Sequence, residues 1–184
     1  MKIGIDVSQL AYENTGVANY LGNLVQSLTK LDRENEYVLF FSSFRKNLKS
    51  QISNLKSANK NVKIKTFRLP PSILDLLWNK LHVFPIEWLI GDVDVFITSD
   101  WTEPPTKKAK KATILYDLAV YKYPNETDRK IVQTQRRKLE WVKKESDIIF
   151  CISKSTAQDA QKILGIEKDR LSVIYPGMQY EDWN

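Results

Sequence analysis

Residues 1–31 read MKIGIDVSQLAYENTGVANYLGNLVQSLTKL, and this opening stretch decides the fold. An apolar run from Ile3 to Val7 predicts a short strand, and apolar residues then recur at helical spacing from Val17 to Leu31. A buried strand that leads through a loop into an amphipathic helix is the unit from which open parallel α/β sheets are built. The stretch therefore predicts the first such unit of the chain.

The loop between this strand and helix is Glu13-Asn14-Thr15-Gly16. Asn14 or Thr15 can cap the helix, and Gly16 lets another group approach first-turn amides that have no partner within the helix. These amides, with the positive end of the helix dipole, favour a phosphate or another anion. The same residues also suit a plain turn, since a glycine at a helix start is common.

The rest of the chain repeats this alternation of strand and helix. Runs rich in Val, Ile and Phe are typical of strands buried on both faces, and segments of helical spacing separate most of them. Expected strands cover 36–42, 62–67, 93–98, 112–116, 147–152 and 171–175, and expected helices cover 44–55, 74–81, about 127–144, and a segment with a capping box of Ser155 and Gln158 that ends at Gly165.

This order predicts a Rossmann-like open, mostly parallel sheet with helices on both faces, over residues 1–175. In such a sheet, ligands bind beyond the carboxyl ends of the strands, near the switch in strand order. The residues just after each strand are therefore where a site is expected. Pro176-Gly177 resembles the exit from a domain, so residues 176–184 are interpreted as the start of a linker.

Composition narrows the class of protein. The 184 residues suffice for one domain with a real core, and their 42% hydrophobic and 27% charged content is globular. The single cysteine, Cys151, excludes an internal disulfide, lies in an apolar strand and is expected in the core. The start of the chain does not read as a signal peptide, and no stretch has the length of a membrane span, so a cytoplasmic protein is expected.

The formal net charge is +6, and basic residues gather in a loop and in one expected helix. Such surfaces can face solvent, anionic lipid, phosphorylated substrates or nucleic acid. No zinc spacing or nucleic-acid module accompanies them, so solvation or a membrane surface is the preferred interpretation and nucleic acid is not an expected partner. The loop contains Lys107, Lys108, Lys110 and Lys111, and the helix contains Arg129, Lys130, Arg136, Arg137, Lys138, Lys143 and Lys144.

Four segments in order along the chain carry a resemblance to a known family. They are GIDVSQL with TGVANYLGNLV after it, ILYDLAVYKYP, DIIFCISKSTAQDAQKILGI, and RLSVIYPGM. With them the chain resembles the amino-terminal, Rossmann-like half of family 4 (group 1) glycosyltransferases, which have the two-domain GT-B architecture. The resemblance implies transfer of a sugar from a nucleotide diphosphate donor, with retained configuration and no metal.

The resemblance also assigns roles to residues. In this family the glycine after the first strand approaches the donor's phosphates. This glycine corresponds to Gly16, and the resemblance implies that Thr15, Gly16 and Val17 bind the donor's phosphates. The Asp-Leu after a middle strand corresponds to Asp117, the candidate catalytic residue, and the serine that opens a later helix corresponds to Ser153. For Asp117, the capping of a loop is an equally good interpretation.

The chain departs from the family in two ways. Many relatives have histidine before the Asp-Leu, where this sequence has Tyr116, and its single histidine is His82 in an apolar helical region. A histidine-dependent role therefore does not carry over. The carboxy-terminal half, which binds most of the nucleotide sugar in the family, is absent from these 184 residues, so a donor-binding domain or subunit is an expected partner.

Acceptor contacts are expected from Asp100, Trp101, Tyr116, Ser153 and Lys154, which all follow strands. A carboxylate beside an aromatic ring suits a sugar, although DWTEPP is also an ordinary loop and Ser153 also suits a helix cap. No metal is expected, because the alternation of a strand explains Asp92-Val93-Asp94. Asp6 is interpreted as a structural hydrogen-bond acceptor.

The apolar segment with Trp78, His82, Phe84 and Trp88 lies near the basic loop and could rest on a membrane to receive a lipid-linked acceptor. A buried helix has the same stripe, and burial is expected for most of it.

The leading hypothesis is therefore the acceptor-side domain of a glycosyltransferase of the hexosyltransferase type, acting in polysaccharide biosynthesis on a saccharide or lipid-linked acceptor. Its co-substrate would be a nucleotide diphosphate sugar, with no further cofactor. This chain would be inactive alone, as a fragment or as a subunit of a split enzyme. It would be cytoplasmic, in part at the inner face of the membrane. The alternative is a non-catalytic Rossmann-type module that binds a nucleotide or a protein. Within it, the absence of G-x-G-x-x-G after the first strand argues against a dinucleotide site, and the absence of a P-loop argues against an ATPase.

Overall fold

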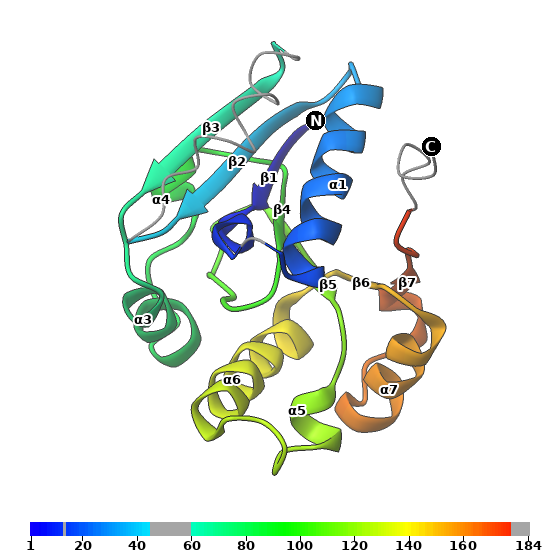
Figure 1. The fold of residues 1–184 in the computed structure, drawn as a ribbon. Helices are drawn as coiled ribbons and strands as arrows, with labels where there is room; N and C mark the ends of the chain where they lie inside the picture. Colours follow the sequence, from blue (N-terminus) through cyan, green and yellow to red (C-terminus); the bar gives the residue numbers. More distant parts are fainter. Residues whose placement is uncertain (13, 45–59, 178–184) are drawn as a thin grey trace.

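The computed structural model describes residues 1–12, 14–44 and 60–177, and these form one sheet of seven parallel strands. The strand order is β3-β2-β1-β4-β5-β6-β7 (Figure 1). Successive strands are added on one side of β1 up to β3 and on its other side from β4 onward, so the order switches between β1 and β4 although all strands are parallel. The Rossmann-like open parallel sheet is therefore confirmed. Its strands are β1 (Lys2–Asp6), β2 (Glu36–Ser42), β3 (Val62–Phe67), β4 (Val95–Thr98), β5 (Lys110–Leu115), β6 (Ile148–Cys151) and β7 (Leu171–Val173).

Helices connect most of the strands, as the alternation predicts. A loop without a helix joins β4 to β5, and residues 45–59 of the connection from β2 to β3 are outside the described residues. The helices are the 3₁₀-helix η1 (Ser8–Ala11), α1 (Gly16–Leu31), α3 (Pro71–Leu74), the π-helix η2 (Asp75–Lys80), α4 (Glu87–Ile90), α5 (Ala119–Lys122), α6 (Arg129–Glu145), α7 (Lys154–Leu164) and the 3₁₀-helix η3 (Lys168–Arg170).

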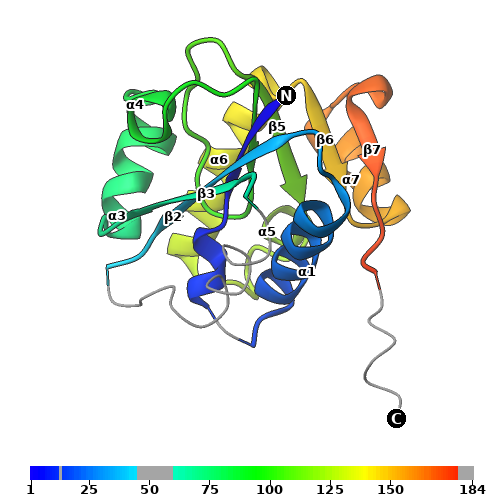
Figure 2. The same cartoon turned by 90° about the horizontal axis from the view of Figure 1, so that it is seen from above.

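Both faces of the sheet are covered, which explains the continuous apolar runs. In β2 every residue after Glu36 is buried, and successive side chains point to opposite faces. Tyr37 and Leu39 pack with α1 on one face, whereas Val38 and Phe40 pack with α3, η2 and α4 on the other. Helices α5, α6 and α7 continue this second face over β5 and β6. Figure 2 shows α3 and α4 on the β3 side of the molecule and α7 with β7 on the opposite side.

Several boundaries differ from those expected. The strand expected over 93–98 begins at Val95, and the one over 171–175 ends at Val173. Helix α7 begins at Lys154 with Ser153 as its cap, so the expected capping box at Ser155 was wrong. The helix expected over 44–55 lies outside the described residues except for Phe44.

In the basic helix α6, Arg129, Lys130, Lys143 and Lys144 are exposed, as a solvated face predicts, but three other cations correct that interpretation. Arg137 pairs with Asp75 at 2.9 Å, and Arg136 donates to the carbonyl of Val120 at 3.0 Å. Lys138 is only 1% exposed. The inward face of α6 therefore uses cations as structural hydrogen-bond donors.

The core prediction for Cys151 is confirmed, since its thiol is buried, and burial raises its pKa to about 11. Across residues 1–12, 14–44 and 60–177, no helix combines the length and the apolar character needed to cross a membrane.

Candidate functional site

The candidate site lies at the carboxyl edge of the sheet, beside the switch in strand order between β1 and β4. Asp6 ends β1 and is 6% exposed. Its carboxylate accepts the amide hydrogen of Ser8 at 2.9 Å, which confirms its structural role. Burial raises the pKa of Asp6, although the Ser8 hydrogen bond and the charge of Lys138 oppose the shift. This end of β1 is thus fixed and poorly accessible.

The loop after η1 leads into an open helix start. The Thr15 hydroxyl donates to the carbonyl of Tyr12 at 3.0 Å and accepts from the amide of Ala18 at 3.2 Å, so Thr15 is the cap of α1. Within the part of the chain that the structure describes, the amides of Gly16 and Val17 have no hydrogen-bond partner. No atom lies within 4 Å of the position that a Cβ on Gly16 would occupy. The first turn of α1 therefore offers two free donors to an open space.

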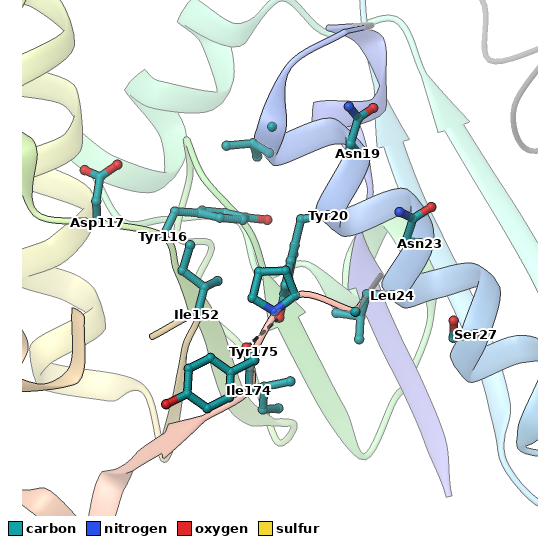
Figure 3. Close-up of a pocket in the computed structure, with 14 residues that line it drawn as sticks. Asn19, Tyr20, Asn23, Leu24, Ser27, Tyr116, Asp117, Ile152, Ile174 and Tyr175 are labelled. Atoms are coloured by element: carbon teal, nitrogen blue, oxygen red, sulfur yellow. Dashed lines mark hydrogen bonds between the residues drawn. The ribbon is translucent and has the colours of Figure 1, made fainter. Parts of the chain in front are cut away.

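This space is a cleft of about 700 Å³ between α1 and the ends of β5, β6 and β7. Figure 3 shows the side chains that line it. One side of the cleft is therefore a single helix, and the other is formed by residues that follow three different strands. Helix α1 contributes Gly16, Val17, Asn19, Tyr20, Asn23, Leu24 and Ser27, and the strand ends contribute Tyr116, Asp117, Ile152, Ile174, Tyr175, Pro176 and Gly177.

Two tyrosines meet in the middle of the cleft. The rings of Tyr20 and Tyr116 are 5.6 Å apart and nearly perpendicular, and the Tyr20 hydroxyl donates to the carbonyl of Ile174 at 3.4 Å. The Tyr116 hydroxyl shares a hydrogen bond of 3.0 Å with that of Ser99. Burial raises the pKa of both tyrosines, and that of Tyr116 strongly, so both phenols stay protonated and keep a hydrogen to donate. Tyr116 thus places a neutral hydroxyl group in the cleft.

Asp117 stands apart from the tyrosine pair. Its carboxylate accepts the amide hydrogen of Ala119 at 2.9 Å and so positions the start of α5. The side chain is nevertheless exposed, and Figure 3 shows it beyond the Tyr116 ring, away from Tyr20. A capping contact and contact with a ligand are therefore compatible for this residue.

A second cavity of about 280 Å³ adjoins the cleft, since both are lined by Val17, Tyr116 and Asp117. It also contains Asp100 and Trp101. The structure therefore brings most of the expected phosphate-side and acceptor-side residues around two connected hollows.

The second cavity holds a carboxyl group in a fixed position. The Gln135 amide donates to both the carboxylate and the carbonyl oxygen of Asp100, at 3.0 Å each. Burial raises the pKa of Asp100, while the nearby charge of Lys138 and the Gln135 hydrogen bond oppose the shift. The carbonyl of Trp101 accepts from the Asn79 amide at 2.9 Å, so the loop after β4 is held on two sides.

Lys138 is a site residue that the sequence reasoning did not identify. Its ammonium lies beneath the second cavity, donating to the Ser99 carbonyl and, at 3.0 Å, to the Thr113 hydroxyl. Burial lowers its pKa, against the influence of the carboxylates of Glu103, Asp100 and Asp6. In the sequence it is one of many cations on α6, and nothing local distinguishes it.

Two residues that were expected at the site do not line it, and three residues that were not expected there do. Ser153 and Lys154 line neither hollow, and the Ser153 hydroxyl accepts from the Thr156 amide at 3.0 Å as the cap of α7. Asn19, Asn23 and Ser27 line the cleft although the sequence did not single them out. Their spacing of four residues was the available signal, but exposed helix faces commonly show the same spacing. Within the described ranges, no three His, Cys, Asp or Glu side chains gather where they could hold a metal ion.

The solved structures similar to this chain include UGT2 of Phytolacca americana, a GT-B glycosyltransferase determined with UDP-2-fluoro-glucose and pterostilbene. The identity is 12% and the TM-score 0.54, over 96% of this chain and 52% of that one. This chain thus spans about half the length of that protein. A short-chain dehydrogenase from Oenococcus oeni PSU-1 is 11% identical, with a TM-score of 0.41 over 96% of each chain.

No match was found among curated proteins. The sequence profile of glycosyltransferase family 4 matches residues 14–182, which is most of the chain. The profile begins at the loop that opens α1 and extends through the last strand, so it covers both sides of the cleft. The chain belongs to glycosyltransferase family 4.

Proposed function

We propose that this chain is the acceptor-side half of a glycosyltransferase that moves a hexose from a nucleotide diphosphate sugar to a saccharide or lipid-linked acceptor. One observation carries the proposal. The open first turn of α1 and the carboxylates of the second cavity face two connected hollows that meet at Tyr116 and Asp117. Family membership supports the reaction class.

Transfer needs stabilisation of the departing diphosphate. As the bond from the sugar carbon to the phosphate oxygen breaks, that oxygen keeps the bonding electrons and gains negative charge. The amides of Gly16 and Val17, at the positive end of a helix of 16 residues, would stabilise this charge. The missing side chain at Gly16 would let the phosphates come close.

The acceptor would occupy the second cavity. Asp100 and Asp117 offer carboxylate oxygens to hydroxyl groups, and Trp101 offers an apolar ring face. The acceptor oxygen bonds to the sugar carbon while its proton passes to the departing phosphate oxygen, and we assign Asp117 to hold that hydroxyl in position. Tyr116 lines both hollows, so its neutral hydroxyl would lie between the two substrates and could donate a hydrogen bond to either.

The finer features follow from the family resemblance. We propose retention of configuration, no metal and no further cofactor, and activity only when a donor-binding domain or subunit closes the cleft. We place the enzyme in the cytoplasm, in polysaccharide biosynthesis. Pro176 and Gly177 line the second side of the cleft, which supports this proposal, because such a domain would follow them in the chain.

Two glycines of α1 provide a matched test. A Cβ on Gly16 would meet open space in the cleft, whereas a Cβ on Gly22 would make ordinary contact with Leu10 at 3.5 Å. Both alanine variants should therefore fold. With the donor-binding half present, donor consumption should fall at least about tenfold in Gly16→Ala, further in Gly16→Val, and little in Gly22→Ala.

Transfer by Gly16→Val at the wild-type rate would contradict the role of the first turn. Absence of turnover with every nucleotide sugar in a panel, from folded protein with both halves, would favour the non-catalytic binding module instead. Circular dichroism of each variant establishes that folding is unchanged.

A further inference from the structure

A group of apolar side chains stands exposed on the segment after β3, away from both hollows. The group, called here the apolar patch, consists of Leu76, Leu81, Val83, Phe84 and Trp88. Their exposed fractions run from 36% for Phe84 to 59% for Trp88. Burial was expected for most of this segment, and it holds for Trp78 and Ile86 but not for the patch.

The π-helix η2 creates the first part of the patch. In an α-helix, residues five apart point about 140° away from one another. In η2 the amide of Leu81 donates to the carbonyl of Leu76 at 3.0 Å, and this wider turn makes the directions of the two leucines more similar than an α-helix would. The same turn directs Trp78 and Asn79 inward. The widened turn thus separates a buried side from an exposed apolar side.

The chain after η2 holds the second part in a strained conformation. His82 and Phe84 have positive φ angles of 50° and 71°, which non-glycine residues adopt at a cost. The Trp78 indole donates to the carbonyl of Phe84 at 3.0 Å, and the His82 ring stacks on Trp141 at 3.6 Å. Buried contacts therefore maintain a backbone that exposes Val83 and Phe84.

A buried carboxylate attaches the basic loop to this segment. Glu87 is 7% exposed, and one of its oxygens accepts the amides of Lys107, Lys108 and Ala109 at 2.7 to 3.3 Å. The Lys107 ammonium lies over the Trp88 ring, 5.1 Å from its centre. Two exposed lysines are thus fixed beside the patch.

The charges around the patch are mostly positive. Lys80, Lys107 and Lys108 are exposed. Of the nearby carboxylates, Glu87 is buried and Asp75 is paired with Arg137 at 2.9 Å and more distantly with Lys80 at 4.0 Å. Glu145, which contacts the His82 ring, is paired with Lys111 at 2.8 Å. Asp92, after α4, is exposed. An anionic surface therefore complements the surroundings of the patch.

We propose that the apolar patch and the lysines beside it dock on a bilayer that contains anionic lipids. Leucine and phenylalanine side chains enter the headgroup boundary, tryptophan prefers that level, and lysines attract acidic headgroups. Binding needs both an apolar and a basic contribution, and this surface has both. Figure 2 shows α3 and α4 on the side of the molecule away from β7 and α7, so docking leaves the cleft uncovered. The inference is independent of glycosyl transfer.

Co-sedimentation with vesicles tests the proposal, using phosphatidylcholine with and without phosphatidylglycerol. The protein should bind the anionic vesicles and should bind less as salt rises. Leu81→Ser with Trp88→Ser should weaken binding at least about tenfold. Lys107→Glu with Lys108→Glu should weaken it about fivefold or more per lysine, only for anionic vesicles.

Matched controls are available on other surfaces. Leu31 ends α1 and is 81% exposed, so Leu31→Ser removes a leucine elsewhere, and Lys162→Glu with Lys168→Glu repeats the charge change near α7. Both controls should bind as the wild type does. Equal binding by all variants, or no binding to anionic vesicles, would overturn the proposal. Self-association that disappears in the Leu81 and Trp88 variant would overturn it too, because the patch would then be a protein interface.

Discussion

Among the lysines of the two basic segments, some are exposed in the fold and others are buried. Lys107 and Lys108 stay exposed beside the apolar patch, whereas Lys111 and Lys138 are 3% and 1% exposed. Lys107, Lys108 and Lys111 belong to the same segment, so composition does not distinguish the exposed lysines from the buried ones, whereas the packing of α6 over β4 and β5 does. A run of basic residues therefore contains both structural and surface cations.

The buried lysines belong to one network of polar contacts between the sheet and α6. Lys111 pairs with Glu103 at 3.1 Å and with Glu145 at 2.8 Å. The other oxygen of Glu103 accepts from the Thr98 hydroxyl at 2.6 Å, and Thr98 contacts Thr113, to which Lys138 also donates. The middle of the sheet therefore depends on charges as well as on apolar contacts.

Removing a buried cation should have the largest effect. Lys111→Met leaves Glu103, which is 0% exposed, without its positive partner. An uncompensated buried charge costs about 3–5 kcal/mol, so the free energy of unfolding should fall by about that amount in urea titrations.

The double variant Lys111→Met with Glu103→Leu sharpens this prediction. Replacing both partners removes the stranded charge, so much of the lost stability should return. A double variant as unstable as the single one would show that the charge is not the cause.

A smaller loss is expected for Lys138→Met, about 1–3 kcal/mol, because the Ser99 carbonyl loses its donor while Thr113 keeps Thr98. The pKa of Asp100 should also rise further in this variant, because in the wild-type protein the charge of Lys138 lowers it. Urea unfolding and an NMR titration of Asp100 measure the two effects. An unchanged Asp100 titration would contradict the electrostatic contact.

The pH dependence of stability should report on Glu145. Burial alone would raise its pKa, but hydrogen bonds and charges from Lys111 and His82 lower it overall. A pKa that is lower in the folded state adds stability above the unfolded value near 4.5, and this part is lost as the pH falls through the folded value. Glu145→Gln should therefore flatten the decline measured by urea unfolding in acid. An equally steep decline in this variant would exclude Glu145 as a source.

The smallest effect on stability should come from the exposed lysines. Lys107→Ala and Lys108→Ala should each change the free energy of unfolding by less than about 0.5 kcal/mol, because neither side chain is buried. Thermal unfolding measures this, and a larger loss would mean that these lysines belong with the buried pair.

The parallel sheet was predictable because the apolar patterns of β1, β2 and β3 can be recognised within each strand, and the structure buries residues in accordance with them. The sequence predicted η2 less well, since a π turn depends on the packing of Trp78 and Asn79 against other elements. The carboxyl end of β7 and the cap of α7 each differed by two residues from the prediction, and at α7 two serines that can cap the helix lie close together.

The site was predictable to the extent that strand ends in a parallel sheet meet at one edge. Gly16, Tyr116 and Asp117 were therefore expected near one another, and the structure places them around one cleft, although their roles stay predictions. Lys138 was missed because its burial arises from contacts with β4 and β5 that are distant in sequence.

The empty space above Gly16 has a consequence for how variation at this residue should be interpreted. Because a Cβ there would meet open space, folding places little restriction on the residue. In a library selected only for soluble expression, position 16 should accept many amino acids. In a library selected for sugar transfer, it should stay glycine. The ratio of the two frequencies would measure, at a single position, what function demands beyond folding.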